Sequence, residues 1–356
     1  MMESNNKQTL YGIEILRFIS AFAILVWHYQ HFYFLDKTHF IVENQPFYQN
    51  LKFFYTYGFQ GVNFFWCVSG FIFYWKYSSI MKTINAKTFF LLRFARLYPL
   101  HFLTLILVSF LQLIYFSNEG KFFLDLNNNF FHFFLQVFMA SYWGFEEGHS
   151  FNSPIWSISL EILVYFLFYF LVKNFSSSNI ANILIILICL GMKIIYEYNA
   201  HAFFDCALFF FVGGFVALNL NIFKKLRYLK ILSSLAVIIT LIISLENNLT
   251  EINNFTYIFQ LFSYPLILLI FFDLQFESDN LKKISSILGN LTYSSYLLHL
   301  PTQILIIILL PKNLILDYSY NNFFFISYML FVLVISFFSY KYFENPMRVY
   351  IRKKII

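Results

Sequence analysis

The chain has 356 residues, of which 60% are hydrophobic and 12% are charged, and its formal net charge is +6. Soluble domains carry about 25% charged residues, so this composition excludes an ordinary soluble enzyme or binding module. Apolar runs of about 20 residues, long enough to cross a bilayer, recur along the whole sequence, and the alternating pattern of a transmembrane β-barrel is absent. We expect an all-α polytopic transmembrane bundle that forms one domain over residues 1–356 and is surrounded by membrane lipid.

The charge and the cysteines argue against several kinds of partner. A modest excess of Lys and Arg is typical of the cationic loops of membrane proteins and indicates no nucleic-acid partner. Cys67, Cys189 and Cys206 are scattered in apolar stretches and predict neither a disulfide framework nor a metal site. The polar start of the chain is followed by no cleavage site of a secretory signal peptide. We therefore expect a multi-pass protein with no bound metal and no permanently bound cofactor.

Eleven apolar segments are candidates for membrane spans. They are Tyr11–Leu35, Tyr57–Tyr77, Phe89–Phe116, Phe130–Tyr142, Pro154–Val172, Ile180–Tyr196, Phe203–Leu220, Tyr228–Leu245, Phe255–Asp273, Ile287–Leu310 and Phe323–Tyr342.

Basic residues predict the orientation of these segments. Lys and Arg concentrate in residues 76–87 with the arginines that follow, in residues 224–230 and in the C-terminal tail, which places these parts in the cytoplasm. An even number of spans must then separate the first two loops. Phe130–Tyr142 is the weakest candidate between them because it is short and interrupted by polar residues, so we interpret it as re-entrant or interfacial. The chain then crosses about ten times, with both termini cytoplasmic.

The first apolar segment carries Glu14, Arg17 and His28 at a depth where ionisable groups are costly. The spacing of Arg17 and His28 corresponds to about 16 Å of helical rise and places both on one face. Glu14 lies one turn before Arg17 and is predicted to pair with it. A structural ion pair and a histidine at the headgroup boundary would also explain these residues. Two polar groups along one stripe of the helix surface instead favour a substrate pathway or a functional site.

The stretch SPIWSISLE, residues 153–161, opens a later span. Ser157 and Glu161 are four positions apart and share a helix face, and the predicted topology places Glu161 at a depth similar to that of His28. A carboxylate beside a histidine raises its basicity and activates hydroxyls for acyl transfer. The structural alternatives are a salt bridge for Glu161 and an interfacial anchor for Trp156.

The stretch RFARLYPLH, residues 93–101, contains two of only six arginines in the chain. Arg93 and Arg96 are predicted at the cytoplasmic end of a span, where simple charge-based orientation explains them. Most basic residues of this chain are lysines, so an arginine is the less common choice. A site that needs the planar guanidinium, such as a clamp for the phosphates of a nucleotide, is therefore an equally good explanation.

Three further blocks contain residues of interest. In GVNFFWCVSGFIF, small residues such as Gly70 favour close helix packing, and Asn63 is a candidate for lining the site. In YSSYLLHLP, His299 is either a site residue or an interhelical hydrogen-bonding group. In YFENPMR, Pro346 is predicted to end the last membrane helix at the inner surface, with Arg348 as an anchor.

Together these segments resemble the membrane acyltransferase-3 family of bacterial O-acyltransferases that modify cell-surface carbohydrates. The similar blocks are IEILRFISAFAILVWH, GVNFFWCVSGFIF, RFARLYPLH, SPIWSISLE, YSSYLLHLP and YFENPMR. They occur in the family's order and cover nearly the whole chain. The sequence departs from the family pattern at Asn63 and Glu14, because the family often has Asp at both positions.

The resemblance implies roles for individual residues. It implies that His28 is the principal catalytic residue, that Arg17 is essential and that Glu161 belongs to the same site. Arg93 and Arg96 are implied to contact the acyl donor on the cytoplasmic side.

Further residues of the same blocks are assigned with them. Tyr98 is assigned to the acyl-donor contact. Glu14, Asn63, Trp156, Ser157 and His299 are possible site-lining residues.

The resemblance also implies a function. We expect transfer of an acyl group, most simply acetyl from acetyl-CoA, to a hydroxyl of an extracytoplasmic or lipid-linked carbohydrate, such as a surface polysaccharide or lipopolysaccharide. The expected location is the bacterial inner membrane. A carrier or flippase for a saccharide-lipid is one alternative, since it would line a path with the same polar residues but would need no acyl donor. A non-catalytic scaffold within a polysaccharide assembly machine is the other.

Overall fold

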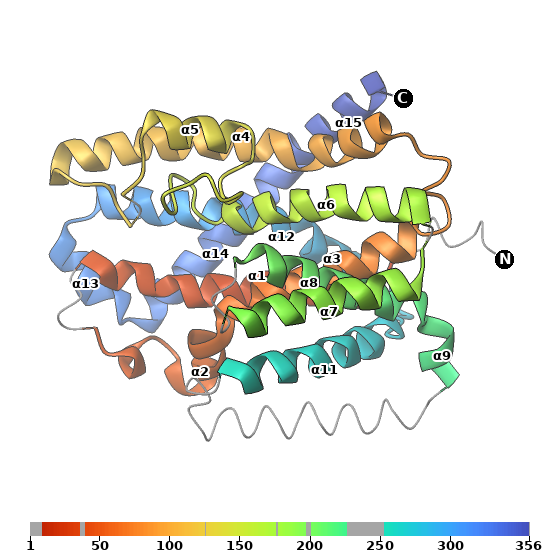
Figure 1. Cartoon of the computed structure of the whole chain (residues 1–356). Helices are drawn as coiled ribbons and strands as arrows, with labels where there is room; N and C mark the ends of the chain where they lie inside the picture. Colours follow the sequence, from red (N-terminus) through yellow and green to blue (C-terminus); the bar gives the residue numbers. More distant parts are fainter. Residues whose placement is uncertain are drawn as a thin grey trace. The chain divides into compact units, whose positions relative to one another are not determined.

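The computed structural model describes residues 9–35, 40–124, 126–175, 177–196, 201–225 and 253–355, and within these ranges every regular element is a helix (Figure 1). Five of the described helices are long and apolar enough to cross a membrane: Tyr11–Leu35, Ala86–Glu119, Ile155–Phe175, Asp279–Leu309 and Asn322–Lys354. Three shorter apolar helices are Asn179–Ile195, Phe203–Leu218 and Phe259–Phe272. The expected all-α membrane fold is confirmed, whereas the number of ten crossings stays a prediction. The expected span Tyr228–Leu245 and most of the basic loop 224–230 lie outside the described residues.

Backbone contacts divide the chain into two compact units. Unit 1 consists of Met1–Ser20, Gln60–Asn85 and Glu161–Gly289, and unit 2 consists of Ala21–Phe59, Ala86–Leu160 and Asn290–Ile356. The elements that contribute residues to both units are α1 (Tyr11–His28), η5 (Gly58–Gln60), α6 (Ile155–Phe175) and α12 (Asp279–Leu309). The assignment of residues 1–356 to one domain stays a prediction.

Unit 1 contains a close crossing of two apolar helices, α3 (Gly61–Tyr77) and α8 (Phe203–Leu218). A side chain at Gly70 would collide with the carbonyl oxygen of Phe210, and a side chain at Gly213 would collide with that of Cys67. Glycines on both helices therefore allow the backbones to touch, which confirms the packing role predicted for Gly70. Among the described residues, unit 1 also contains α7 (Asn179–Ile195), α9 (Leu220–Lys225) and α11 (Asn253–Phe272), beside its parts of α1, α6 and α12.

The acidic residue Asp205 lies in an apolar sequence, and unit 1 supplies it with two partners. The Nζ of Lys193 on α7 donates to its Oδ2 over 2.9 Å, and the hydroxyl of Tyr257 on α11 donates to its Oδ1 over 2.8 Å. The carboxylate on α8 is thus compensated by a cation and a hydroxyl from two neighbouring helices. Such pairing is what a charge in a low-dielectric environment requires, so these residues serve the structure of unit 1.

Unit 2 is organised around α4 (Ala86–Glu119) and α12. The other described elements that lie wholly in unit 2 are η2 (Tyr29–Leu35), η4 (Val42–Asn44), α2 (Tyr48–Tyr57), α5 (Phe130–Val137), α13 (Lys312–Ser319), α14 (Asn322–Ser339), the π-turn η7 (Tyr340–Glu344) and α15 (Asn345–Ile355). In the core of this unit the hydroxyls of Tyr29 and Tyr33 both donate to the carbonyl oxygen of Ser319, over 2.8 and 2.7 Å. These bonds satisfy two buried phenols and hold α13 against η2.

The stretch interpreted as re-entrant or interfacial forms only the short helix α5, whose eight residues rise about 12 Å. Its polar residues dock it inside unit 2. His101 of α4 bonds through Nε2 to the carbonyl oxygen of Gln136 over 2.7 Å, and the Gln136 amide donates to the carbonyl oxygen of Ser150 over 2.9 Å. The prediction that this stretch forms no complete span is confirmed, because α5 is too short to cross.

The last membrane helix does not end at Pro346, which corrects the prediction from the ENPMR block. The chain passes from α14 through η7 into α15, and Pro346 lies in the first turn of α15. The Asn345 N–H bonds to the carbonyl oxygen of Tyr340, five residues earlier, which is the π pattern. A helix tolerates proline in its first turn because that N–H has no helical partner, so the chain continues as helix.

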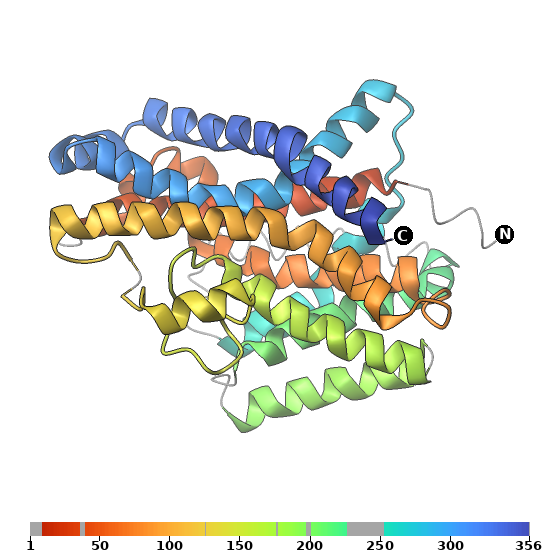
Figure 2. The same cartoon turned by 90° about the horizontal axis from the view of Figure 1, so that it is seen from above.

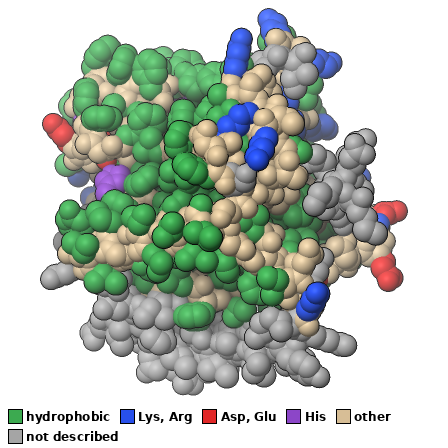
Figure 3. Space-filling model, turned by 45° about the vertical axis from the view of Figure 1, so that its right-hand side comes forward, with side chains coloured by type: hydrophobic (Ala, Val, Ile, Leu, Met, Phe, Trp, Pro, Cys, Tyr) green, Lys and Arg blue, Asp and Glu red, His purple; other side chains and the backbone are tan. Residues whose placement is uncertain are grey.

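Hydrophobic side chains cover much of the face drawn in Figure 3. On α4 the side chains of Phe110 and Leu113 are 61% and 60% exposed, and on α14 Phe323 is 77% exposed. Water would make such surfaces a strong aggregation site, whereas lipid tails cover them at no cost. The long apolar helices are therefore those of a membrane protein.

Candidate active site

The two charged residues predicted to pair on α1 do so. The Arg17 guanidinium donates to the Glu14 carboxylate over 2.6 Å, and the Arg17 side chain is buried. In unit 1 the Glu14 carboxylate packs directly against Gly289 of α12, where any side chain would collide with it. The salt bridge and the contact with Gly289 together hold the position of this part-buried ion pair.

His28 is the last residue of α1 and belongs to a group of histidines in unit 2. Its ring stacks on that of His299 from α12, with centroids 4.8 Å apart and planes 20° apart. The His31 ring centroid also lies 4.8 Å from that of His28. His299 is fully buried and its Nδ1 lies 3.3 Å from the carbonyl oxygen of Ser295, while its Nε2 has no hydrogen-bond partner in the described parts of the chain. The structure thus brings His28 and His299 together.

Gln303 of α12 connects His28 and His31, the two histidines at the end of the first apolar segment. Its amide nitrogen donates to the His28 carbonyl oxygen over 2.9 Å, and its Oε1 lies 3.1 Å from Nδ1 of His31. Because this amide oxygen is an acceptor, His31 must carry its proton on Nδ1, which leaves its Nε2 as an acceptor. Gln303 therefore fixes both the backbone at His28 and the tautomer of His31.

The start of α6 contributes a second polar group to unit 2. The hydroxyls of Ser157 and Tyr296 lie 2.7 Å apart, and the Tyr296 hydroxyl donates to the Pro154 carbonyl oxygen over 2.9 Å. Tyr296 is one turn before His299 on α12, with ring centroids 6.1 Å apart. Ser157 is thus connected to the histidine pair through a single tyrosine.

Trp156 lies beside this group and contacts the loop that follows α5. The rings of Tyr142 and His149 stack with centroids 5.4 Å apart, and Trp156 meets them at 5.3 and 6.0 Å. Desolvation raises the pKa of the half-buried Tyr142 phenol, and the nearby Glu146 carboxylate adds to the increase. Tyr142 therefore remains a neutral hydroxyl at physiological pH. Trp156 serves as a packing partner of the loop in this arrangement.

Glu161 and Asn63 lie in unit 1. Glu161 follows Ser157 by one turn of the continuous helix α6 and is buried. Its position toward His28 stays a prediction. The Asn63 amide donates to the side chains of Gln60 and Gln260 over 2.9 and 3.2 Å, so Asn63 belongs to a group of amides in this unit.

The residues predicted to contact the acyl donor divide between two sides of α4. Arg93 is buried and Arg96 half-buried, and their spacing of three places them on one side of the helix. Tyr98 instead stacks in an aromatic row with Phe94 and Phe102, at centroid distances of 4.4 and 5.8 Å. Helical periodicity places this row opposite the two arginines, so the structure does not bring Tyr98 together with them.

A second cationic helix packs against α4 in unit 2. Figures 1 and 2 show α15 alongside α4, and the two helices are in contact. Arg348 and Arg352 of α15 are half-buried, whereas Lys353 and Lys354 are exposed. The guanidinium groups of four of the six arginines in the chain are therefore carried by two neighbouring helices.

Sequence reasoning missed His31, Tyr296, Gln303 and the cations of α15 as neighbours of the site. A signal for the first three was present. Tyr296, His299 and Gln303 recur at intervals of three and four in an apolar stretch, which places them on one face of a helix, and His31 follows His28 by three. Polar residues at helical spacing inside a membrane span indicate a functional face.

The comparisons with known proteins agree with these motifs. A family described as an acyltransferase domain matches residues 10–341, which is nearly the whole chain. No curated protein matches the chain, and neither does any solved structure. The chain therefore belongs to the acyltransferase-3 family of membrane acyltransferases.

Proposed function

We propose that this protein transfers an acyl group, most simply acetyl, from acyl-CoA on the cytoplasmic side of the inner membrane to a hydroxyl of an extracytoplasmic or lipid-linked carbohydrate. The observation that carries this proposal is the stacked pair of His28 and His299 inside a chain of the acyltransferase-3 family. Imidazole is the side chain best suited to accept a proton from a hydroxyl at neutral pH.

In the proposed reaction His28 is the general base. The hydroxyl oxygen of the acceptor attacks the carbonyl carbon of the thioester while His28 accepts the hydroxyl proton. The carbon–sulfur bond then breaks, and the thiolate leaves with that proton as the free thiol of CoA. The products are an O-acyl ester and CoA, with no net change in protons on the enzyme. Glu161 is proposed to face His28 and to favour the imidazolium that forms during the attack.

The donor is proposed to approach from the end of α4 that carries the arginines. CoA is a polyanion, and guanidinium groups bind phosphate through two parallel hydrogen bonds. Arg93 and Arg96 on α4, with α15 alongside, supply such groups from two packed helices of unit 2. Arg17 lies about 16 Å along α1 from His28, within the same uninterrupted helix, and is proposed to border the path of the acyl arm.

The test compares surface glycans from cells that produce the wild-type protein, the His28→Ala variant or the His201→Ala variant. His201 is an exposed histidine of unit 1, so its removal makes the same chemical change away from the site. Wild-type and His201→Ala cells should carry a glycan mass increment of about 42 Da, which is expected for an acetyl ester. His28→Ala cells should lack it although the protein is inserted in the membrane. An unchanged increment in the inserted His28→Ala variant would refute the proposed base.

A further inference from the structure

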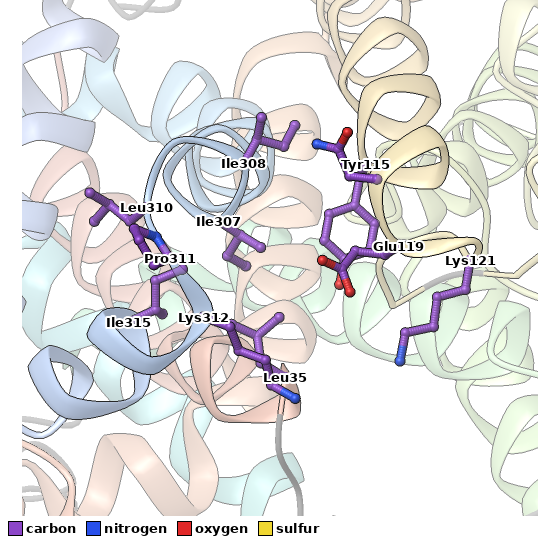
Figure 4. A pocket seen from close by; sticks show the side chains of 11 residues that line it. Leu35, Tyr115, Glu119, Lys121, Ile307, Ile308, Leu310, Pro311, Lys312 and Ile315 are labelled. Carbon is purple, nitrogen blue, oxygen red and sulfur yellow. The ribbon is translucent and has the colours of Figure 1, made fainter.

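Unit 2 contains a cavity of about 160 Å³ at the end of its helices opposite to the arginines of α4. It lies where η2, α4 and α12 end and α13 begins (Figure 4). Pockets for drug-sized ligands have volumes of about 300–1,000 Å³, so this cavity fits a single ring-sized group. Its size is the first constraint on what it binds.

The floor of the cavity is apolar. Ile307 of α12 and Ile315 of α13 are buried, as is the ring of Tyr115 from α4. In Figure 4 the Tyr115 ring projects from α4 toward the isoleucines of α12.

The rim of the cavity carries charged groups of both signs. Lys121 and Lys312 supply two cations, Glu119 supplies one carboxylate, and Asn118 supplies an amide. All four residues are exposed, so they meet a ligand at the mouth of the cavity, beside the isoleucine floor. Donors and acceptors in one rim suit a group rich in hydroxyls, and the surplus of one positive charge favours a group with a single negative charge.

The cavity is connected to the histidine pair by two elements of unit 2. His28 is followed directly by η2, which ends at Leu35 on the cavity wall after a rise of about 14 Å. On α12 the eight positions from His299 to Ile307 correspond to about 12 Å. A ligand in the cavity therefore lies within the same unit as His28 but too far away to be the group that reacts there.

We propose that this cavity binds an acidic sugar residue of the acceptor glycan, neighbouring the sugar whose hydroxyl reacts at His28. Lys121 and Lys312 bind its acid group, Glu119 and Asn118 bind its hydroxyls, and the isoleucine floor contacts its C–H face. This assignment rests on the proposed acyl transfer to a carbohydrate and specifies the kind of glycan that is accepted.

The test measures binding without an acyl donor. The full-length protein in nanodiscs of phosphatidylcholine is titrated with D-glucuronate and with D-glucose, and bound sugar is detected by saturation-transfer NMR. We expect D-glucuronate to bind about fivefold more tightly than D-glucose, which corresponds to about 1 kcal/mol from two exposed charge contacts. Lys121→Gln with Lys312→Gln should abolish the preference, whereas Lys121→Arg with Lys312→Arg should retain it. Lys52→Gln removes a lysine of α2 outside the cavity and should also retain it.

The outcomes separate this proposal from the catalytic one. Equal binding of both sugars by the wild type, or an unchanged preference in the double Gln variant, overturns the acidic-sugar assignment and leaves acyl transfer untouched. Loss of D-glucuronate binding when phosphatidylglycerol is added to the nanodisc identifies the cavity as a lipid headgroup site and also overturns it. The His28→Ala variant should bind D-glucuronate like the wild type while lacking transfer.

Discussion

The imidazole of His28 stacks on the imidazole of His299, which comes from a helix more than two hundred residues away in the sequence. The near-parallel rings are 4.8 Å apart at their centroids. Stacking holds the orientation of His28. The Ser295 carbonyl oxygen, 3.3 Å from Nδ1 of His299, holds the second ring, and the Tyr328 hydroxyl donates to the backbone carbonyl oxygen of His299 over 3.3 Å. The buried Nε2 of His299 is the one nitrogen of this ring left for a proton or a substrate among the described residues.

The first prediction concerns that nitrogen. His299→Phe keeps a ring to stack on His28 but removes both nitrogens, and we expect the rate of acyl transfer to fall about 10²-fold, at the lower end of the range for proton-transfer groups. The pH–rate profile of the variant should also lose one titration step. If His299 served packing alone, the Phe variant would keep both the wild-type rate and the wild-type profile.

The second prediction concerns Gln303, whose amide joins the His28 backbone to the His31 ring. Gln303→Leu leaves a carbonyl oxygen and an imidazole nitrogen unpaired in a buried place, so we expect the free energy of unfolding to fall by about 1–3 kcal/mol for each group. The neighbouring variant Thr302→Val is the control, because the Thr302 hydroxyl bonds back to the carbonyl oxygen of Leu298 in its own helix. Thermal unfolding in detergent measures both, and equal stability of the two variants contradicts the role of Gln303.

Spacing along one helix was sufficient to predict part of the site. The ion pair of Glu14 and Arg17 follows from their separation of three positions, because neighbours on a helix meet whatever the rest of the fold does. The pairing of His28 with His299 does not follow from spacing, since it depends on how α1 and α12 pack. The helix-stop signal of proline gave the wrong helix end at Pro346, because a π-turn lets the chain continue as helix past this residue.

Composition predicted the class of fold better than its details. The high apolar content fixes a helical membrane protein, because backbone groups in lipid must be satisfied within the helix. It does not fix helix ends, which depend on caps and contacts. Thus Phe130–Tyr142, already the weaker candidate, forms an eight-residue helix that ends at Val137, whereas Ile180–Tyr196 forms a seventeen-residue helix.

The third prediction concerns Gly289, which leaves room for the Glu14 carboxylate. Gly289→Ala places a methyl group where that carboxylate lies, and we expect the free energy of unfolding to fall by about 1–3 kcal/mol. We also expect reduced acyl transfer, because the displaced carboxylate no longer pairs with Arg17 in its original position. Gly191→Ala is a matched control: it is also a helix-interior glycine, but a methyl group there meets no atom within 4 Å. That control should be neutral or slightly stabilising, since Ala favours the helix over Gly. Equal stability of the two variants would show that Glu14 moves aside freely.

The fourth prediction concerns the cationic helix α15. The premise is that Arg348 and Arg352 contribute to the donor site with the arginines of α4. Arg348→Gln and Arg352→Gln should then each raise KM for acyl-CoA about tenfold, with little change in kcat. A tenfold loss of affinity is expected when a hydrogen bond to a charged group is removed. The effect should shrink as salt is added, because screening weakens the contact with phosphate. Lys354→Gln on the same helix removes an equal charge, but the Lys354 ammonium lies over the Tyr350 ring, 4.6 Å from its centroid, and is exposed. We therefore expect KM to stay unchanged in Lys354→Gln. A rise in KM of the same size in all three variants would mean that donor binding depends on the total charge of the tail and not on the two half-buried guanidinium groups.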